Sequence, residues 1–163
     1  MSKVIVVTGG SSGIGAALGE LLASQGHQVV LVARRQAALE EVASRCGGRG
    51  DVQVADVTDR AQVRRVVEET IAKFGRIDVW VNNAGQGITR APTELTDDDI
   101  DTMMRSNVHS ALYGMQEVLQ LIRDNKWPIV AVIEFEYKVP PGSDRMAEMA
   151  KCVEFCKNAL LSK

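Results

Sequence analysis

The sequence predicts a three-layer, doubly wound α/β fold built on a parallel sheet of about five strands. Two observations lead to this prediction. Short β-branched runs alternate along the chain with segments of helical period. The runs are apolar throughout instead of alternating with polar residues, which is typical of parallel strands covered by helices on both faces. Right-handed crossovers then favour the strand order 3-2-1-4-5, with a long last strand at the edge.

The elements follow in order from these patterns. Thr96 and the three aspartates after it indicate an N-cap and an acidic first turn, which predicts a long helix over residues 97–123. The helix dipole explains the acidic run, so we expect no metal site there. Before this helix the expected strands span 3–8, 28–33, 52–55 and 78–81, and the expected helices span 13–25, 36–46 and 59–74.

Apolar residues recur along the long helix at helical spacing, and their arc is wider than one sheet face needs. The main stripe consists of Ile100, Met104, Val108, Ala111, Met115, Leu119 and Ile122. The residues that widen it are Met103, Leu112, Val118 and Leu121. The wide arc favours a homodimer contact through helix 97–123 and the C-terminal helix, with a well-covered monomer as the alternative.

Composition excludes several classes of partner. The chain is 45% apolar and 25% charged with a net charge of −2, so no electrostatic field attracts nucleic acid or anionic lipid. The apolar runs are too short to span a membrane, and no signal-peptide pattern opens the chain, so we expect a cytoplasmic protein. The cysteines, Cys46, Cys152 and Cys156, are expected to be reduced and to bind no metal.

The first strand runs into a glycine-rich turn that leads directly into a helix. Glycines allow the backbone to approach a pyrophosphate closely, and the free N–H groups of the helix N-terminus favour an anion. The turn therefore predicts a dinucleotide site. Its candidate binding residues are Gly9, Ser11, Ser12, Gly13, Ile14 and Gly15.

Three motifs in chain order resemble the short-chain dehydrogenase/reductase family over roughly residues 1–120. They are Thr8-Gly9-x-x-x-Gly13-x-Gly15, Asp56-Val57 and Asn82-Asn83-Ala84-Gly85. The resemblance implies a Rossmann-like fold in which the glycine turn holds pyrophosphate and Asp56 and Val57 contact the adenine. It implies that Asn83, Ala84 and Gly85 line the cofactor, and that Asn107 is the helix asparagine that joins a water-mediated proton relay.

The residues after the second strand indicate which dinucleotide is preferred. Sites that prefer NAD offer an acidic side chain to the ribose 2′-hydroxyl, whereas this chain has Arg34 and Arg35 there. Guanidinium groups donate charge-assisted hydrogen bonds that suit a 2′-phosphate. We therefore expect NADP(H) to be preferred over NAD(H).

The catalytic residues that the resemblance implies are missing. The family places a serine at the end of the fifth strand, where this chain has Glu134, and a Tyr-x-x-x-Lys on the following helix. Here Tyr137 is followed four residues later by Pro141, and Tyr113 by Glu117. We therefore assign no catalytic residue and expect an inactive, engineered or chimeric NADP(H)-binding scaffold. The alternatives are an active NADP-dependent oxidoreductase that uses substitute acids or a partner chain, and a structural fold without ligand.

The C-terminal part is organised differently. From residue 129 a strand is expected whose second half alternates apolar and charged residues, and Pro140-Pro141-Gly142 ends it before an amphipathic helix. We expect one Rossmann-like domain over residues 1–163, in which 1–123 form the cofactor-binding part and 129–162 an atypical strand–helix cap.

Overall fold

The computed structural model describes residues 2–125. The chain divides into two compact units, Met1–Ile129 and Val130–Lys163, and the described residues belong to the first. The strand and helix expected within 129–162 lie outside the described residues. The single-domain organisation of residues 1–163 stays a prediction.

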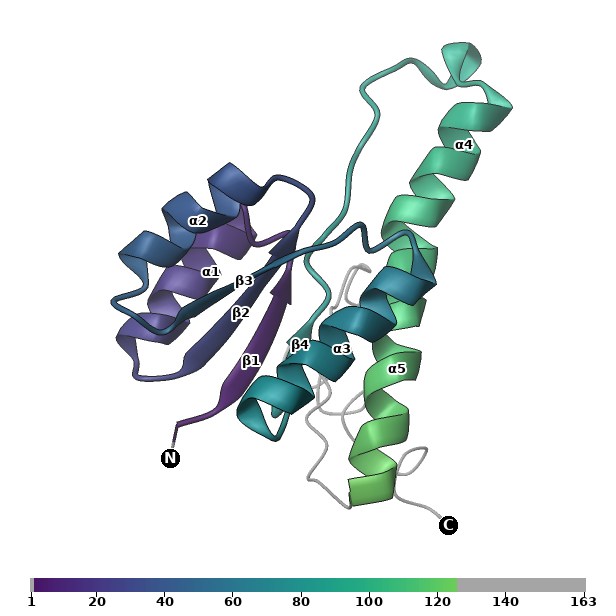
Figure 1. The fold of residues 1–163 in the computed structure, drawn as a ribbon. Helices are drawn as coiled ribbons and strands as arrows, with labels where there is room; N and C mark the ends of the chain where they lie inside the picture. The colour runs from purple at the N-terminus through teal and green to yellow at the C-terminus, as the bar shows by residue number, and fades with distance from the viewer. Residues whose placement is uncertain (1, 126–163) are drawn as a thin grey trace, which may run out of the picture. The chain divides into compact units, whose positions relative to one another are not determined.

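A four-stranded parallel sheet forms the centre of the described unit (Figure 1). Its strand order is β3-β2-β1-β4, which confirms the predicted order for these four strands. The fifth predicted strand falls outside the described residues. The bounds are β1 Val4–Thr8, β2 Gln28–Ala33, β3 Gly50–Val54 and β4 Val79–Val81.

β3 begins two residues earlier than the sequence patterns predicted. Gly50 pairs with Val29 of β2, although glycine is a poor strand former. A Cβ at residue 50 would lie 3.0 Å from the Cα of Ala43 and from the Cβ of Cys46. The close approach of the helix that contains Ala43 therefore selects glycine at this position, which a propensity pattern does not reveal.

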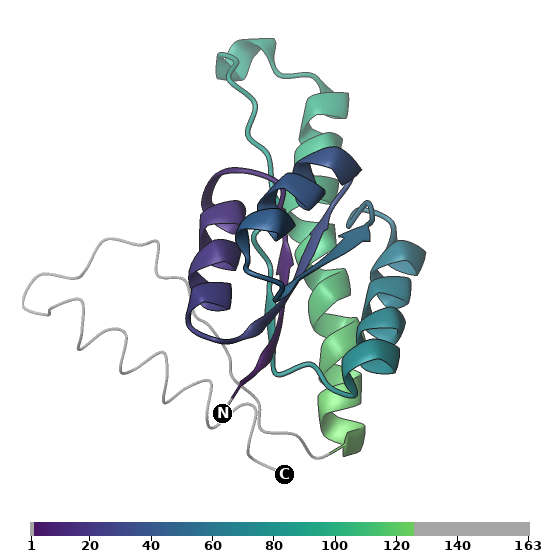
Figure 2. The same cartoon turned by 60° about the vertical axis from the view of Figure 1, so that its left-hand side comes forward.

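Helices cover both faces of the sheet, as the fold class predicts (Figures 1 and 2). On one face lie α1 (Gly13–Ser24) and α2 (Gln36–Arg45), and on the other α3 (Arg60–Phe74) and α5 (Ser110–Asn125). Successive residues of a strand point to opposite faces, so β1 and β2 supply both cores. The α1/α2 core contains Ile5, Val7, Ala16, Ala23, Val29, Leu31, Leu39, Val42 and Cys46. The α3/α5 core contains Val6, Val30, Val32, Ala55, Val66, Val67, Ile77 and Val118.

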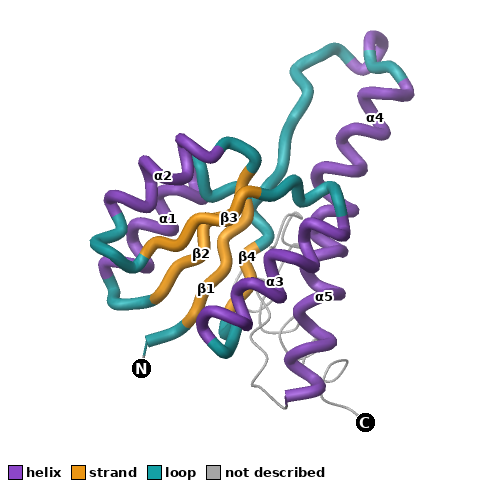
Figure 3. The backbone as a smooth tube through the Cα atoms, viewed as in Figure 1, coloured by secondary structure: helices purple, strands orange, loops and turns teal. Residues whose placement is uncertain are grey.

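A long loop after β4 leads through a 3-10 turn, η1 (Pro92–Glu94), to the predicted long helix (Figure 3). The helix begins as expected at Thr96. The Thr96 hydroxyl accepts a hydrogen bond from the Asp99 N–H at 3.2 Å, and the Asp99 carboxylate accepts one from the Thr96 N–H at 3.0 Å. The Thr96 N–H and then the Thr96 hydroxyl, which donates to the same carboxylate at 2.9 Å, hold the pKa of Asp99 below its ordinary value.

The long helix is not regular throughout, in contrast to the prediction. It consists of α4 (Asp97–Met103), a π-helical segment η2 (Met104–His109) and α5. Two side chains of η2 donate hydrogen bonds to main-chain carbonyls at the end of α4. The Ser106 hydroxyl donates to the Thr102 carbonyl at 2.7 Å, and the Asn107 amide donates to the Met103 carbonyl at 3.1 Å. Such bonds compete with the regular helical pattern, which explains the interruption.

The face of this helix that packs on the sheet differs from the predicted apolar stripe. Small residues face the sheet: Ser110 is buried, and a Cβ at Gly114 would run into the Trp80 indole of β4. Several members of the predicted stripe are exposed instead, namely Ile100, Met104, Val108 and Met115. Helix and sheet approach closely at these two positions, so size selects the residue there. Val118, which was predicted to widen the apolar stripe, is buried in the α3/α5 core. Within residues 2–125, no helix has the length and apolar character to cross a membrane.

Candidate functional site

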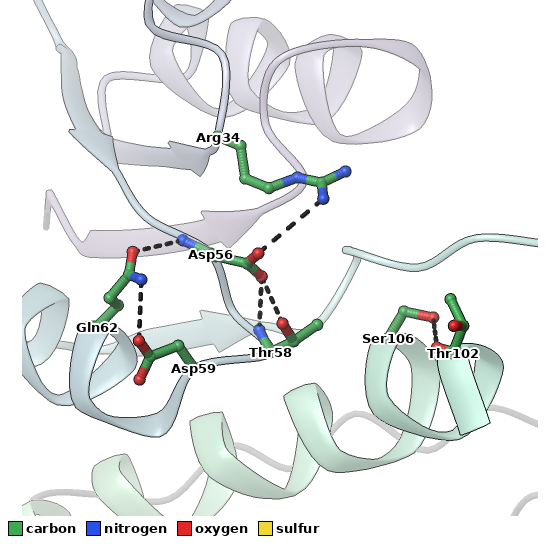
Figure 4. A network of polar contacts seen from close by, with 7 residues as sticks. All are labelled: Arg34, Asp56, Thr58, Asp59, Gln62, Thr102 and Ser106. Carbon is green, nitrogen blue, oxygen red and sulfur yellow. Dashed lines mark hydrogen bonds and ion pairs between the residues drawn. The ribbon is translucent and has the colours of Figure 1, made fainter. Parts of the chain in front are cut away.

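A cavity of about 720 Å³ lies at the carboxyl ends of the four strands. Open α/β sheets bind ligands at this edge, and the volume falls within the range of small-molecule sites. Figure 4 shows part of its lining, with Arg34, Asp56 and Thr58 from the strand ends and Thr102 and Ser106 from the long helix. The cavity is therefore walled by both the sheet edge and the helix.

Most of the residues predicted from the motifs lie on the wall of this cavity. Gly13, Gly15 and Asn107 are the exceptions. The predicted residues that line it are Gly9, Ser11, Ser12, Ile14, Arg34, Arg35, Asp56, Val57, Asn83, Ala84 and Gly85. The lining residues that the sequence did not single out are Val32, Ala33, Ala55, Thr58, Gln86, Thr102, Arg105 and Ser106. The fold brings the motifs together; their contact with a cofactor stays a prediction.

Residues 9 and 15 must be glycine because other parts of the chain approach them too closely for a side chain. Gly9 has a φ of +68°, and a Cβ there would lie 2.9 Å from the Cα of Ala84. Any side chain at residue 15 would run into the Gly9 carbonyl and the Asn83 amide nitrogen. These glycines thus bring the turn after β1 against the segment after β4, with no side chain between them.

Thr8 and Asn83 join the ends of β1 and β4. The buried Thr8 hydroxyl donates to the Val81 carbonyl and accepts from the N–H groups of Asn83 and Ala84, each at 3.0 Å. The Asn83 side-chain amide donates to the Thr8 carbonyl at 3.0 Å. This network satisfies the polar groups at both strand ends and holds the segment that forms one cavity wall.

Two arginines line the cavity: Arg35 lies beside the predicted cofactor turn, and Arg34 lies beside Asp56, which follows β3. Arg35 donates to the hydroxyls of Ser11 and Ser12 at 3.5 and 3.4 Å. The Arg34 guanidinium lies 4.0 Å from the Asp56 carboxylate, and the Arg34 side chain is 74% exposed. Exposed contacts of this length stabilise the fold little, so both guanidinium groups are available to an anionic ligand.

Asp56 is held by its own turn. One carboxylate oxygen accepts from the N–H and hydroxyl of Thr58 at 2.9 and 2.8 Å, and the Asp56 N–H donates to Gln62 at 2.9 Å (Figure 4). Asp59 caps α3 through the Ala61 N–H. The Gln62 side chain and then this N–H lower the pKa of Asp59. The turn therefore orients the Asp56 carboxylate at the cavity, and the Asp59 carboxylate caps the start of α3.

Asn107 lies beside the cavity wall without lining the cavity. Its amide oxygen accepts from the Gln86 N–H at 2.9 Å, and its amide nitrogen donates to the Gln86 carbonyl at 2.8 Å. A Cβ at Gly85 would come within 2.6 Å of the same amide oxygen. In this structure the side chain anchors the loop after β4 to the helix; participation in a proton relay stays a prediction.

Three acidic side chains lie in the first turn of α4. Residues 2–125 contain no group of three or more His, Cys, Asp or Glu side chains arranged to hold an ion. The three aspartates at the start of α4 include Asp99, which is engaged by Thr96 and by Arg90 at 2.6 Å. The dipole and capping interpretation of this acidic run is sufficient.

Comparison with known proteins assigns the chain to a family. The family model for short chain dehydrogenases matches residues 3–134. An uncharacterized oxidoreductase of Staphylococcus saprophyticus is 42% identical over 121 residues, which make up 72% of this chain and 52% of that protein. A 3beta-hydroxysteroid dehydrogenase of Mediterraneibacter gnavus is 35% identical over 134 residues, which make up 80% of this chain and 49% of that protein. The chain spans about half the length of the curated relatives it matches.

Solved structures agree with this assignment. The crystal structure of a 3-ketoacyl-(acyl-carrier-protein) reductase from Brucella melitensis, complexed with NADH, matches with a TM-score of 0.72 and 31% identity, over 76% of this chain and 51% of that one. A short-chain dehydrogenase from Streptomyces avermitilis matches with a TM-score of 0.71 and 32% identity, over 76% of this chain and 46% of that one. Because the family model covers most of the sequence and the fold is shared, the chain belongs to the short-chain dehydrogenase family.

Proposed function

We propose that this chain binds a nicotinamide dinucleotide in the cavity at the sheet edge, with NADP(H) preferred over NAD(H). The observation that carries the preference is the position of Arg34 and Arg35 on the cavity wall, at the end of β2. A guanidinium group pairs with a 2′-phosphate through charge-assisted hydrogen bonds, whereas it cannot accept a bond from a 2′-hydroxyl. The NADH complex of the Brucella melitensis reductase supports the class of ligand.

The lining supports one orientation of the dinucleotide. The turn from Gly9 to Ile14 receives the pyrophosphate at the N-terminus of α1, and the adenine lies against Asp56 and Val57. Ile14 is 80% exposed at this cavity, which is unusual for an isoleucine and suits an apolar contact with a bound ligand. Asn83, Ala84 and Gly85 line the remaining wall.

We propose further that reduction of a carbonyl by this chain alone is very slow. The sequence holds two tyrosines, Tyr113 and Tyr137, and neither is followed by a lysine four residues later. Tyr113 packs beside the Arg60 guanidinium, 5.7 Å from the ring centre. A positioned general acid contributes a factor of about 10²–10⁴ to the rate. The competing proposal, turnover through substitute acids such as Glu134 or through a partner chain, draws on the relatives that are named oxidoreductases.

Calorimetric titration of the full chain with NADPH, NADH and 2′,5′-ADP tests the binding proposal. NADPH and 2′,5′-ADP are expected to bind, and NADH more weakly. Failure of all three to bind below millimolar concentration overturns the proposal and favours a structural fold without ligand. Where NADPH binds, its consumption with a panel of ketones and aldehydes separates the scaffold from the enzyme.

The variant Arg34→Asp tests the basis of the preference. It is expected to weaken NADPH by about tenfold more than NADH, the scale of a lost charge-assisted hydrogen bond. Arg49→Asp is the matched control, because it makes the same charge change at an exposed residue just before β3 and outside the cavity lining. Equal weakening of NADPH and NADH by Arg34→Asp rejects the proposed role of this arginine.

We also propose a homodimer contact through the long helix. Five apolar side chains of this helix are 40–47% exposed, namely Ile100, Met104, Val108, Leu112 and Met115. Apolar surface of this kind supports an interface. The C-terminal helix that was predicted to share the contact lies outside the described residues. Sedimentation velocity of the wild type and of Met104→Asp tests the proposal: a monomeric wild type at micromolar concentration rejects it.

A further inference from the structure

The helix side of the cavity holds a third arginine that the sequence motifs did not single out. Thr102, Arg105 and Ser106 all line the cavity, and their spacing of three and four residues places them on one side of the helix. Arg105 and Ser106 belong to the π-helical segment η2. Single π-helical turns within α-helices occur frequently at functional sites, because they redirect side chains relative to the regular helix.

Arg105 has no strong partner within the described residues. Its one ion pair there is to Asp98, at 4.0 Å, and the Asp98 side chain is 90% exposed. The Arg105 side chain is itself 57% exposed. A pair of this length between exposed groups contributes little to folding. The fold therefore leaves the five N–H donors of this guanidinium available to a ligand in the cavity.

The charge of the lining favours an anion. The ionisable residues on the cavity wall are Arg34, Arg35, Arg105 and Asp56, and the Asp56 carboxylate is already bonded by Thr58. Three guanidinium groups and one carboxylate leave the cavity with an excess of positive charge. Arg34 and Arg35 come from the end of β2, whereas Arg105 comes from the helix. A ligand in the cavity is therefore exposed to cations from two separate elements.

We infer that Arg105 is a phosphate contact of the bound dinucleotide, supplied by the long helix in addition to the arginines of β2. This inference rests on the proposed function, because it requires the dinucleotide to occupy this cavity. Its chemistry is a charge-assisted hydrogen bond from the guanidinium to a phosphate oxygen, either of the pyrophosphate or of the 2′-phosphate. The long helix and the glycine turn then contact the same bound dinucleotide.

Calorimetric titration of three variants with NADPH and NADH tests the inference. Arg105→Gln is expected to weaken NADPH by about tenfold, and Arg105→Lys, which keeps the charge, by about threefold or less. Arg123→Gln is the matched control, since it removes one positive charge from an exposed arginine in the last turn of α5, outside the cavity lining. Loss for NADPH alone identifies the 2′-phosphate, and equal loss for NADH identifies the pyrophosphate; both support the inference.

The outcomes separate this inference from the function on which it rests. If the wild type binds neither dinucleotide, the proposed function fails and the role of Arg105 fails with it. If the wild type binds NADPH and Arg105→Gln weakens it no more than Arg123→Gln does, only the role of Arg105 is overturned. Equal loss in Arg105→Gln and Arg105→Lys also overturns it, since shape instead of charge would then matter. Thermal unfolding of each variant checks that the fold is unchanged.

Discussion

The side chain of Asn107 pairs with both main-chain polar groups of Gln86. The amide oxygen accepts from the Gln86 N–H at 2.9 Å and the amide nitrogen donates to the Gln86 carbonyl at 2.8 Å, so a helix residue completes the hydrogen bonding of a loop residue. The loop that it holds carries Ala84, Gly85 and Gln86 along the cavity wall. One side chain of η2 thus holds this wall together with the Thr8 network.

Replacing Asn107 by Ala is expected to destabilise the fold by about 1 kcal/mol, because two solvent-exposed hydrogen bonds to the main chain of Gln86 are lost. It is also expected to weaken NADPH, since the loop is then less ordered before binding. Asn125→Ala is the control, because among residues 2–125 the Asn125 amide makes one bond, to the Leu121 carbonyl at 2.9 Å, near the end of α5. Urea unfolding and calorimetry measure both effects. Unchanged stability in Asn107→Ala would contradict the anchoring role.

Thr8→Val is expected to cost about 1–3 kcal/mol of stability despite the equal size of the two side chains. The hydroxyl of Thr8, a residue that is 3% exposed, accepts a hydrogen bond from the Ala84 N–H. Valine has no hydroxyl, so the Ala84 N–H loses this acceptor. Thr8→Ser keeps the hydroxyl and is expected to lose only about 1 kcal/mol for the methyl group. Equilibrium urea unfolding compares the two, and a Ser variant less stable than Val would reject the network.

Gly114→Ala is expected to destabilise the protein by about 1–3 kcal/mol, although alanine is the better helix former. The new Cβ would meet the Trp80 indole and lie 2.7 Å from the Asn82 side-chain oxygen. Trp80→Leu removes the indole, so the same substitution in that background is expected to cost less. Thermal unfolding of the four proteins completes the cycle. If Gly114→Ala costs the same stability with and without the indole, the result would show that the helix has room to move.

The stability of the fold is expected to depend on Glu117 in acid. Glu117 accepts from Arg64 at 3.1 Å and from Arg60 at 2.8 Å, and these bonds, that of Arg64 first, lower the pKa of Glu117. A lowered folded-state pKa contributes stability that is present above the unfolded-state value, about 4.3, and lost as the pH falls through the folded-state value.

Glu117→Gln is therefore expected to be less stable than the wild type by about 1 kcal/mol at pH 6, a value that allows for the half-exposed arginines. The difference should shrink as the pH falls through the lowered pKa of Glu117, because the wild-type carboxyl is then also protonated. Melting temperatures of both proteins across this range measure it. A constant difference would mean that the effect of the substitution is steric. Asp59 and Asp99, whose pKa values are also lowered, make both proteins less stable in acid without affecting the comparison.

Sequence patterns predicted an element correctly where its structure depends on residues that are neighbours in the chain. The apolar runs predicted β1 and β2 within one residue, and Thr96 predicted the start of α4, because strand burial and N-capping depend on neighbouring residues. The glycine turn and the Asp56 and Asn83 segments were correctly expected at strand ends, since parallel strands bring their carboxyl ends to one edge.

The sequence by itself determined the order of elements, the strand order of the four described strands and the motifs that line the cavity. Only the tertiary structure decided which face of the long helix is buried, because Gly114 is selected by the Trp80 indole of a distant strand. It also decided that Arg105 reaches the cavity, 20 residues beyond the last motif at Gly85. Hydropathy and propensity describe a residue and its neighbours in the chain, whereas close packing and shared cavities depend on segments that meet only after folding.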